Sequence, residues 1–334
     1  MAAVVKDGQL VWSGAVGIAD LEHDIDLAVD HRLRIGSVSK PLTAVLTLRL
    51  AQADIISLDT EISHYIPELP SEIGSVTARQ LGSHISGIRH FNFANFAEAN
   101  NMMYRHRLVE GINFFADDPL LFAPGEEFEY SSFGYNLLGA VLEHAGDGEF
   151  GKLFDAHVTK TFGLDQTRID HPFDIIEGRV GFYTVTAENP FFTWMKNGEV
   201  INTIFRDSSD YYPSGGMLSS ASDLARFTAQ IFESDILTEE MRALISTPAK
   251  LNSGAAAGFN ENVLYSFGWE IHLNEAGEIR SYGHNGETNG AYAMIRYFPK
   301  TGLAVAGIAN YNIVGNEPVF FGAIGDALPA LFTD

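Results

Sequence analysis

The sequence lacks cysteine, is poor in basic residues and contains no long apolar run. Because none of its 334 residues is cysteine, disulfides, thiol nucleophiles and cysteine-ligated metal sites are excluded. Lys and Arg number 21 against 43 Asp and Glu, and the formal net charge of −22 repels phosphate backbones, so we expect no nucleic-acid partner. Every apolar run falls short of the ~18 residues that span a bilayer, so we expect a soluble chain without a membrane span.

The amino-terminal stretch MAAVVKDGQLVWSG lacks the basic start and the long apolar core of a signal peptide. A signal peptide removed before this chain begins would leave no trace, so a cytoplasmic and a secreted location both stay open. With 46% hydrophobic residues the chain is long enough to bury a substantial core, and nothing in it sets an oligomeric state.

Hydrophobic periodicity predicts strands at both ends of the chain and helices between them. Two strands flank a turn at residues 6–9, whose Asp-Gly pair suits a tight hairpin, and strand-like runs fill residues 265–312. An amphipathic helix is expected at residues 41–53, and the last apolar segment is also expected to be helical. Further helices are expected at 77–84, 97–115, 132–144 and 150–162, after Ser220, and in LTEEMRALIS.

This order of elements predicts an α+β fold in which one antiparallel sheet is built from both termini. We expect residues 1–60 and 205–334 to form a discontinuous α/β domain that contains the sheet. Residues 61–204 are expected to form a mostly helical lobe beside it, with the active site between the two.

The stretch Ser37-Val38-Ser39-Lys40 lies where the first long helix is expected to begin. N–H groups at a helix start favour an oxyanion, and residues i and i+3 share a helix face, so the Lys40 amine would lie next to the Ser37 hydroxyl. An amine that loses its charge through burial can act as the base that activates the serine. The alternative is a helix start followed by a solvated lysine, because a Ser-x-x-Lys match arises by chance roughly once in a chain of this length.

Two more stretches carry candidate functional groups. Tyr130 and Ser132 stand at a loop-to-helix junction; the phenol can exchange a proton if nearby cations lower its pKa, and the Ser132 hydroxyl can bond a substrate. The alternative is a packed tyrosine and a helix-capping serine. His284-Asn285-Gly286 closes a strand-like segment where small residues let a ligand approach, and His284 is either a donor to that ligand or a surface histidine.

Together, Ser-Val-Ser-Lys, Tyr-Ser-Ser and His-Asn-Gly stand in the order and rough spacing of the three motifs of serine β-lactamases and penicillin-binding proteins. The sequence most resembles the class C β-lactamase-like group, which includes D-Ala-D-Ala carboxypeptidases, D-aminopeptidases and family VIII esterases. Phrases such as RIGSVSKPLTA, LLFAPGEEFEYSSFGYNLLGAVLE and YYPSGGMLSSASDLARF extend the resemblance along nearly the whole chain. SVSKPLTA, GSHISGIRHF and YSSFGYNLLG are similar to lactamase-like serine peptidases related to the animal mitochondrial filament-forming protein.

The resemblance implies a role for each of these residues. Ser37 would be the acylated nucleophile, Lys40 its activating partner, and Tyr130 the group that passes a proton to the leaving group. The backbone N–H groups of Ser37 and Glu287 would form the oxyanion hole. His284 would take the place of the lysine in the family's Lys-Thr-Gly motif.

The sequence departs from the class C pattern at two of these positions. Ser132 stands where class C enzymes carry an asparagine. A serine is shorter than an asparagine and would reach an amide side chain of the substrate less well. His284, Asn285 and Gly286 replace Lys-Thr-Gly, and an imidazole is mostly neutral at pH 7, so the fixed positive charge facing a substrate carboxylate is reduced. The literal Pro-Lys-Thr-Gly at residues 299–302 is interpreted as a turn between two strands.

We therefore expect a serine hydrolase that forms an acyl-enzyme on a small-molecule ester, peptide or amide substrate. The alternatives are a D-Ala-D-Ala-type carboxypeptidase or weak β-lactamase and, in another class, a scaffold or filament-forming protein that keeps the fold. We expect no metal and no organic cofactor, since no His/Asp/Glu cluster shows ligand spacing. Substrate identity depends on loops near residues 86–120 and 170–212, which the sequence does not resolve.

Overall fold

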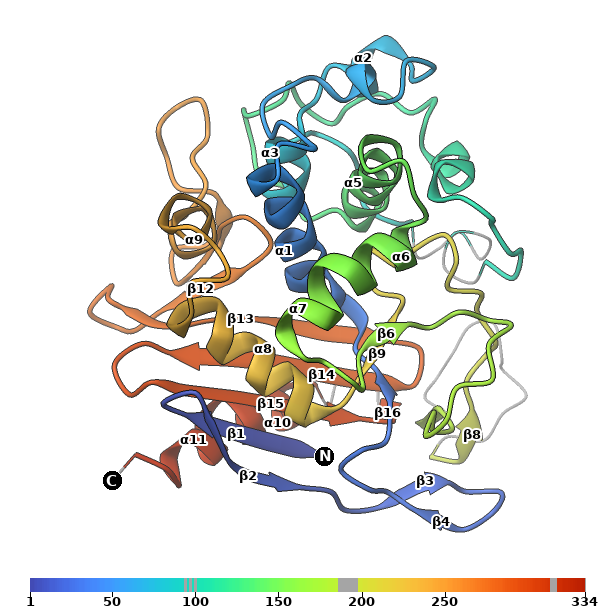
Figure 1. The fold of residues 1–334 in the computed structure, drawn as a ribbon, viewed down its shortest axis with the longest axis vertical. Coiled ribbons are helices and arrows are strands. Elements are labelled where there is room, and N and C mark those ends of the chain that lie inside the picture. The colour runs from blue at the N-terminus through green and yellow to red at the C-terminus, as the bar shows by residue number, and fades with distance from the viewer. Residues whose placement is uncertain (93–94, 96–97, 99–100, 186–197, 313–316, 334) are drawn as a thin grey trace.

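The computed structural model describes residues 1–334 except 93–94, 96–97, 99–100, 186–197, 313–316 and 334. Its largest sheet has eight antiparallel strands in the spatial order β10-β11-β12-β13-β14-β15-β1-β2 (Figure 1). Because β1 pairs with β15, both ends of the chain enter one sheet, which confirms the sequence prediction. The strands are β1 (Ala2–Lys6), β2 (Gln9–Gly14), β10 (Gly258–Asn260), β11 (Val263–Tyr265), β12 (Glu270–Leu273), β13 (Ile279–Thr288), β14 (Ala291–Phe298) and β15 (Leu303–Ala309).

Helices cover both faces of this sheet. Helix α8 (Ala221–Glu233) lies across one face (Figure 1). The other face packs against the last helical segment, which consists of α10 (Glu317–Gly322), a π-helical turn (Ala323–Ala327) and α11 (Leu328–Ala330). Strands β14 and β15 are therefore buried on both sides, which explains why their sequences are almost continuously apolar.

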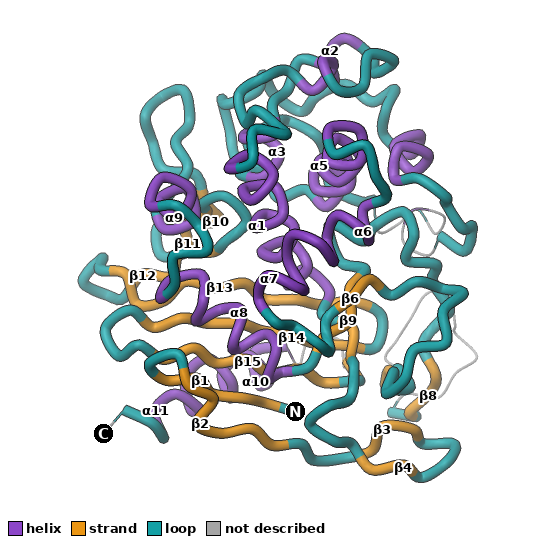
Figure 2. The backbone as a smooth tube through the Cα atoms, viewed as in Figure 1, coloured by secondary structure: helices purple, strands orange, loops and turns teal. Residues whose placement is uncertain are grey.

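Helix α1 (Ser39–Gln52) runs between the sheet and a layer of helices from the middle of the chain (Figure 2). The prediction of a helix here is confirmed, but the prediction that it is amphipathic is wrong, because every residue from 39 to 48 is buried. The sheet packs against one side of α1 and helices from the middle of the chain pack against the other, so no face of the helix is left exposed to water. The 3-10 turn η1 (Gly36–Val38) leads directly into α1 and carries Ser37.

The middle of the chain supplies most of the remaining helices. The helices expected at 77–84, 132–144 and 150–162 are confirmed, and the Ser220 hydroxyl caps α8 by accepting a 3.1 Å hydrogen bond from the Asp223 N–H. The helices of the middle segment are α2 (Ser71–Gly74), α3 (Ala78–Gly82), α5 (Ser132–Ala145), α6 (Phe150–Phe154), a π-helical turn (Asp155–Thr159) and α7 (Lys160–Phe162), with 3-10 helices η2 (Ile62–His64) and η3 (Leu108–Phe114). Helix α9 (Glu239–Ser246) confirms the helix expected in LTEEMRALIS.

The single α-helix expected at residues 97–115 is wrong for most of its described part, although Glu98 is helical. Residues 101–107 have no helical turns, and 108–114 form only the 3-10 helix η3. The Asn101 carbonyl oxygen accepts from the Asp207 N–H at 2.9 Å, and the Arg105 N–H donates to Ser209 Oγ at 2.6 Å. These bonds to a distant loop replace the i to i−4 bonds of a helix. Residues 97, 99 and 100 lie outside the described residues.

Short strands tie the connecting segments together. They are β3 (Ile18–Asp20) with β4 (Ile25–Asp26), β5 (Leu33–Arg34) with β9 (Met217–Ser219) and β6 (Arg168–Ile169), and β16 (Tyr311–Asn312) with β7 (Tyr183–Val185) and β8 (Val200–Asn202). The expected domain boundaries near residues 60 and 205 stay a prediction. Of the helices that the structure describes, none is long and apolar enough to cross a membrane.

Candidate active site

Ser37 lies where the turn before α1 touches strand β13. Gly36 has a positive φ of 49°, and a Cβ on it would lie 2.6 Å from the Glu287 carbonyl oxygen, so only glycine fits. Gly286 is under the same constraint, because a Cβ there would collide with the Ile35 carbonyl. These two glycines let the Ser37 turn pass directly beside the backbone of Glu287, where the two N–H groups of the expected oxyanion hole would be found.

Lys40 points back from the first turn of α1 toward Ser37. Its Nζ lies 3.1 Å from Ser37 Oγ, 3.0 Å from Ser132 Oγ and 2.9 Å from the Ser214 carbonyl oxygen. The side chain is fully buried, and no carboxylate among the described residues pairs with it. Burial therefore lowers the pKa of the Lys40 amine well below its usual range. A neutral amine that touches a serine hydroxyl is suited to act as a base.

Tyr130 lies beside the same amine. The centroid of its ring is 4.7 Å from Lys40 Nζ, and its phenol shares a hydrogen bond with the Ser37 hydroxyl. Burial raises the pKa of the Tyr130 phenol above its ordinary value, although the bond with Ser37 acts in the opposite direction. The idea that nearby cations lower this pKa is therefore not what the structure shows, because burial is the largest influence on it. Tyr130 is a protonated phenol that can donate.

Ser132 lies behind Lys40. Its hydroxyl accepts the 3.0 Å hydrogen bond from Lys40 Nζ and is buried, while its backbone N–H donates to His90 Nδ1 at 3.1 Å. The neighbouring Ser131 is the residue that caps α5, because its hydroxyl accepts from the Gly134 N–H at 2.9 Å. Ser132 thus orients the amine in this structure.

His284 is buried on β13, with 2% of its surface exposed. Its Nδ1 lies 2.5 Å from the Asn285 carbonyl oxygen and its Nε2 3.1 Å from the Tyr265 hydroxyl. A neutral ring with a proton on Nδ1 satisfies both contacts, since Nε2 then accepts from the phenol. Burial lowers the pKa of His284 to about 4, so this position carries no fixed positive charge at neutral pH.

A buried ion pair supports His284 from the neighbouring strands. Glu270 Oε2 lies 3.3 Å from Arg296 Nη2 and 2.8 Å from His272 Nε2, and its other oxygen is 3.8 Å from His284 Nδ1. Burial opposes the ionisation of Glu270, but its electrostatic interaction with His284, a hydrogen bond from His272 and the Arg296 guanidinium outweigh it and lower its pKa to about 2. The Arg296 guanidinium also donates to Asn285 Oδ1 at 2.7 Å, so the Asn285 side chain is held by the Glu270–Arg296 ion pair.

Sequence reasoning missed two histidines beside Tyr130, namely His84, which is buried, and His90, which is partly buried. The His84 ring centroid is 4.4 Å from that of Tyr130, and its Nδ1 accepts from the Ser131 N–H at 3.1 Å. The His90 ring meets Tyr130 edge-on at 5.6 Å. Burial, and then the nearby Lys40, lowers the pKa of both histidines. They lie more than forty positions before Ser131 and Ser132, so no local spacing reveals the contact.

Comparison with known proteins places this geometry in a family. The Beta-lactamase family model matches residues 1–318. The chain is 28% identical over 302 aligned residues to the serine beta-lactamase-like protein LACTB, mitochondrial, of Homo sapiens, and this match covers 68% of the chain and 52% of that protein. It is 28% identical over 180 residues to esterase EstB of Burkholderia gladioli, covering 49% of the chain and 45% of the esterase.

A solved structure shows the same fold. The penicillin binding protein from Bacillus halodurans superposes with a TM-score of 0.81, at 22% sequence identity, over 99% of this chain and 95% of that one. The chain spans about half the length of the first curated relatives it matches. Since the family model covers nearly all of the sequence, the chain belongs to the Beta-lactamase family.

Proposed function

We propose that this protein is a serine hydrolase that works through an acyl-enzyme on Ser37. The observation that carries the proposal is the state of Lys40, a fully buried amine that touches Ser37 Oγ at 3.1 Å and has only neutral oxygens as partners. Burying an amine without a counter-ion is costly unless the amine gives up its proton. A buried amine that destabilises the fold and lies next to a serine hydroxyl indicates a catalytic base.

The arrangement supports a balanced sequence of proton transfers. Ser37 Oγ attacks the substrate carbonyl carbon and gives its proton to Lys40 Nζ, while the oxyanion forms beside the N–H groups of Ser37 and Glu287. Tyr130 gives its phenolic proton to the leaving group and recovers one from Lys40. Water then attacks the acyl group and gives a proton to Lys40, which returns it to Ser37 Oγ as the ester bond to the enzyme breaks.

The His284 side of the centre favours an acyl group without a free carboxylate. His284 is neutral near pH 7 and lies 3.8 Å from the ionised Glu270, so this side offers a substrate carboxylate no attraction. A neutral ester or amide meets no such obstacle. The likeness to an esterase over 180 residues supports an ester as the class of substrate.

The direct test compares Ser37→Ala with Ser39→Ala. Ser39 is a matched control because it is buried two positions away and its hydroxyl has no hydrogen-bond partner in the part of the chain that the structure describes. We expect Ser37→Ala to lower kcat/KM for p-nitrophenyl butyrate by about 10³-fold or more and to abolish labelling by a fluorophosphonate. Ser39→Ala should keep both. A Ser37→Ala protein that matches the parent would overturn the proposal.

A D-Ala-D-Ala-type carboxypeptidase or weak β-lactamase is the second candidate, supported by the fold shared with a penicillin binding protein. Nitrocefin turnover and an intact-mass shift after treatment with penicillin would support it. A protein that takes up neither penicillin nor a fluorophosphonate, and that assembles into polymers, would instead be the scaffold considered from the sequence.

A further inference from the structure

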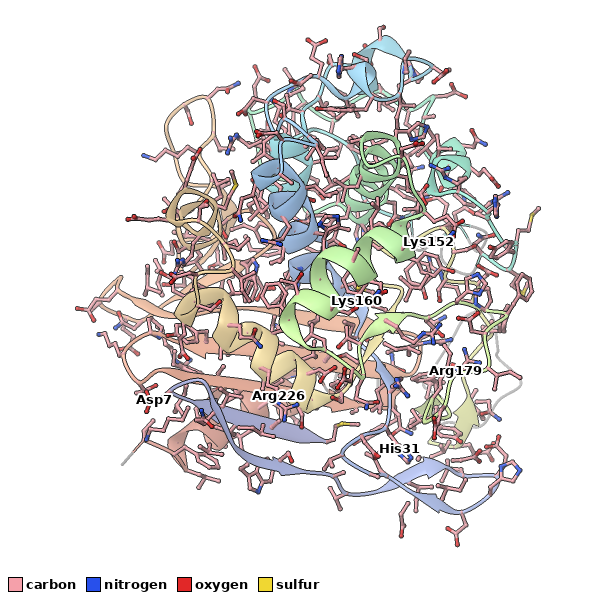
Figure 3. All side chains as sticks on the ribbon, viewed as in Figure 1. Asp7, His31, Lys152, Lys160, Arg179 and Arg226 are labelled. Atoms are coloured by element: carbon pink, nitrogen blue, oxygen red, sulfur yellow. The ribbon has the colours of Figure 1, made fainter. Side chains whose placement is uncertain are left out.

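A cavity of about 730 Å³ lies apart from the Ser37 centre. Its walls come from the α6 to α7 helical segment, from residues 104–108, from strand β6 and from the loop that carries Ser209 and Tyr212. Lys152 and Lys160, both labelled in Figure 3, stand on the helical wall. Neither Ser37, Lys40, Tyr130 nor His284 lines it. Its volume falls in the range of pockets that bind small molecules.

The wall of this cavity is cationic for such an acidic protein. Five Lys and Arg but only four Asp and Glu line it, whereas the whole chain has 21 and 43. Three of the four acids already pair with a cation: Glu143 with Arg107, Glu149 with Lys152, and Asp155 with Lys160. The fourth, Asp165, is exposed.

Arg105 is a cation of the cavity wall that pairs with none of these four acids. Its backbone N–H is held by Ser209, but its guanidinium forms no ion pair with any residue that the structure describes, and its Nε is buried without a partner. The Nε atoms of Arg32 and Arg168, which also line the cavity, are likewise buried and unpaired, although their terminal nitrogens bond elsewhere.

Tyr212 adds an unpaired hydroxyl to the same wall. The residue is only 7% exposed, and its hydroxyl is buried with no hydrogen-bond partner among the described residues. A buried phenol usually finds a partner, because leaving it without one costs about 1–3 kcal/mol. Three unpaired guanidinium N–H groups and one unpaired phenol O–H thus belong to residues that line this cavity, and an oxygen-rich anion supplies acceptors of the kind they lack.

We propose that this cavity is a binding site for a small organic anion that presents carboxylate or phosphate oxygens, with Arg105 as the charge partner and Tyr212 as a hydrogen-bond donor. The local cations attract the anion at short range, and salt screens the more distant surface acids beyond about 8 Å. Pro213 and Ser214 follow Tyr212 directly, and the Ser214 carbonyl holds Lys40 at 2.9 Å. The ligand would therefore contact the segment that positions the catalytic amine.

Calorimetric titration of the intact protein tests the proposal. The probes are inorganic phosphate, glucose 6-phosphate and citrate, each added at constant ionic strength so that general screening does not change. The variants are Arg105→Gln and Tyr212→Phe, with Arg280→Gln as the matched control, because Arg280 pairs with Asp326 on the far edge of the molecule. Circular dichroism and melting temperatures show that each variant is folded.

We expect saturable one-to-one binding of at least one probe, weakened about tenfold or more by Arg105→Gln, less by Tyr212→Phe, and unchanged by Arg280→Gln. Phosphate-bearing and carboxylate-bearing probes distinguish the two sources of oxygens. Ser37→Ala should bind as the parent does, so the result stands whether or not Ser37 is a nucleophile. No saturable binding of any probe at millimolar concentration, or equal binding by folded Arg105→Gln and Tyr212→Phe proteins, overturns the proposal.

Discussion

Lys40 and Glu270 are both buried, yet they meet very different surroundings. Lys40 Nζ faces two hydroxyls and a carbonyl, and no described carboxylate neutralises it. Glu270 is paired with Arg296 and bonded by His272. Burial without a counter-ion lowers the pKa of the amine well below its usual range, whereas counter-ions lower the pKa of the buried carboxylate and keep it charged.

The difference teaches how to separate chemistry from support in this centre. An ionisable group that the fold buries and leaves unpaired is available for proton transfer. A group that is buried and fully paired holds neighbouring strands in place, and its removal leaves the partner charge stranded. Substitution of Lys40 should therefore lower the rate of the reaction, whereas substitution of Glu270 should lower the stability of the fold.

The largest effect is expected from Lys40→Met, which removes the amine and keeps a long apolar side chain. Without the base, kcat/KM for a p-nitrophenyl ester should fall by about 10³-fold, while the protein stays folded because an unpaired buried amine contributes little to stability. Steady-state kinetics and thermal unfolding measure the two quantities. Lys300→Met on the exposed β14–β15 turn is the control, and a Lys40→Met enzyme with parental kcat/KM would remove Lys40 from the mechanism.

The next effect is expected from Glu270→Gln, which should lower the free energy of unfolding by about 3 kcal/mol at pH 7, because Arg296 is then buried without its partner. The folded-state pKa of Glu270, about 2, lies below its ordinary value of 4.5. Its contribution is thus complete above pH ~4.5 and is lost as the pH falls toward 2.

Urea unfolding of the parent and the Glu270→Gln protein from pH 7 to pH 3 checks both the size and the sign. The difference in the free energy of unfolding between the two proteins should shrink as the pH falls below about 5. The lowered pKa of Glu270 corresponds to roughly 3 kcal/mol of this free energy in total. Glu278→Gln, whose carboxylate is exposed beside Lys300, should change little at any pH. A difference that grows on acidification would contradict the assignment of a low pKa to Glu270.

The Lys40 side of the centre was predictable from sequence because its main contact is local. Ser37 and Lys40 are three positions apart where the 3-10 turn η1 runs into α1, so the 3.1 Å contact follows from local helical geometry. The sheet was also predictable, since hairpin turns at residues 6–9 and 299–302 separate apolar runs and the structure places both turns between paired strands.

The remaining contacts join residues that are far apart in the chain. Ser132 and Ser214 lie 92 and 174 positions from Lys40, and neither the hydroxyl nor the carbonyl carries a local signal that it will bond an amine. Glu270 and Arg296 become partners only because the order of the strands brings β12 and β14 to either side of β13. The helix prediction for residues 101–107 was wrong for the same reason, because these residues form hydrogen bonds with a distant loop.

The smallest effect is expected from His284→Lys, which puts a positive charge on the side that lacks one. The parent should hydrolyse p-nitrophenyl butyrate with a lower KM than mono-p-nitrophenyl succinate, because the succinyl carboxylate approaches Glu270 and finds a neutral imidazole. His284→Lys should lower KM for the succinate about tenfold, which corresponds to ~1.4 kcal/mol, and leave the butyrate nearly unchanged. Glu270 holds part of the new charge, so a larger gain is not expected.

His284→Gln separates the effect of charge from the effect of replacing the ring. Glutamine is neutral, so KM for the succinate should stay high in that variant even though the bond with Tyr265 is disturbed. If His284→Lys and His284→Gln change the succinate and the butyrate alike, position 284 does not face the acyl group. The preference for neutral acyl groups would then have to come from another wall of the site. A gain confined to the lysine variant and the charged ester would show that the imidazole sets that preference by remaining uncharged.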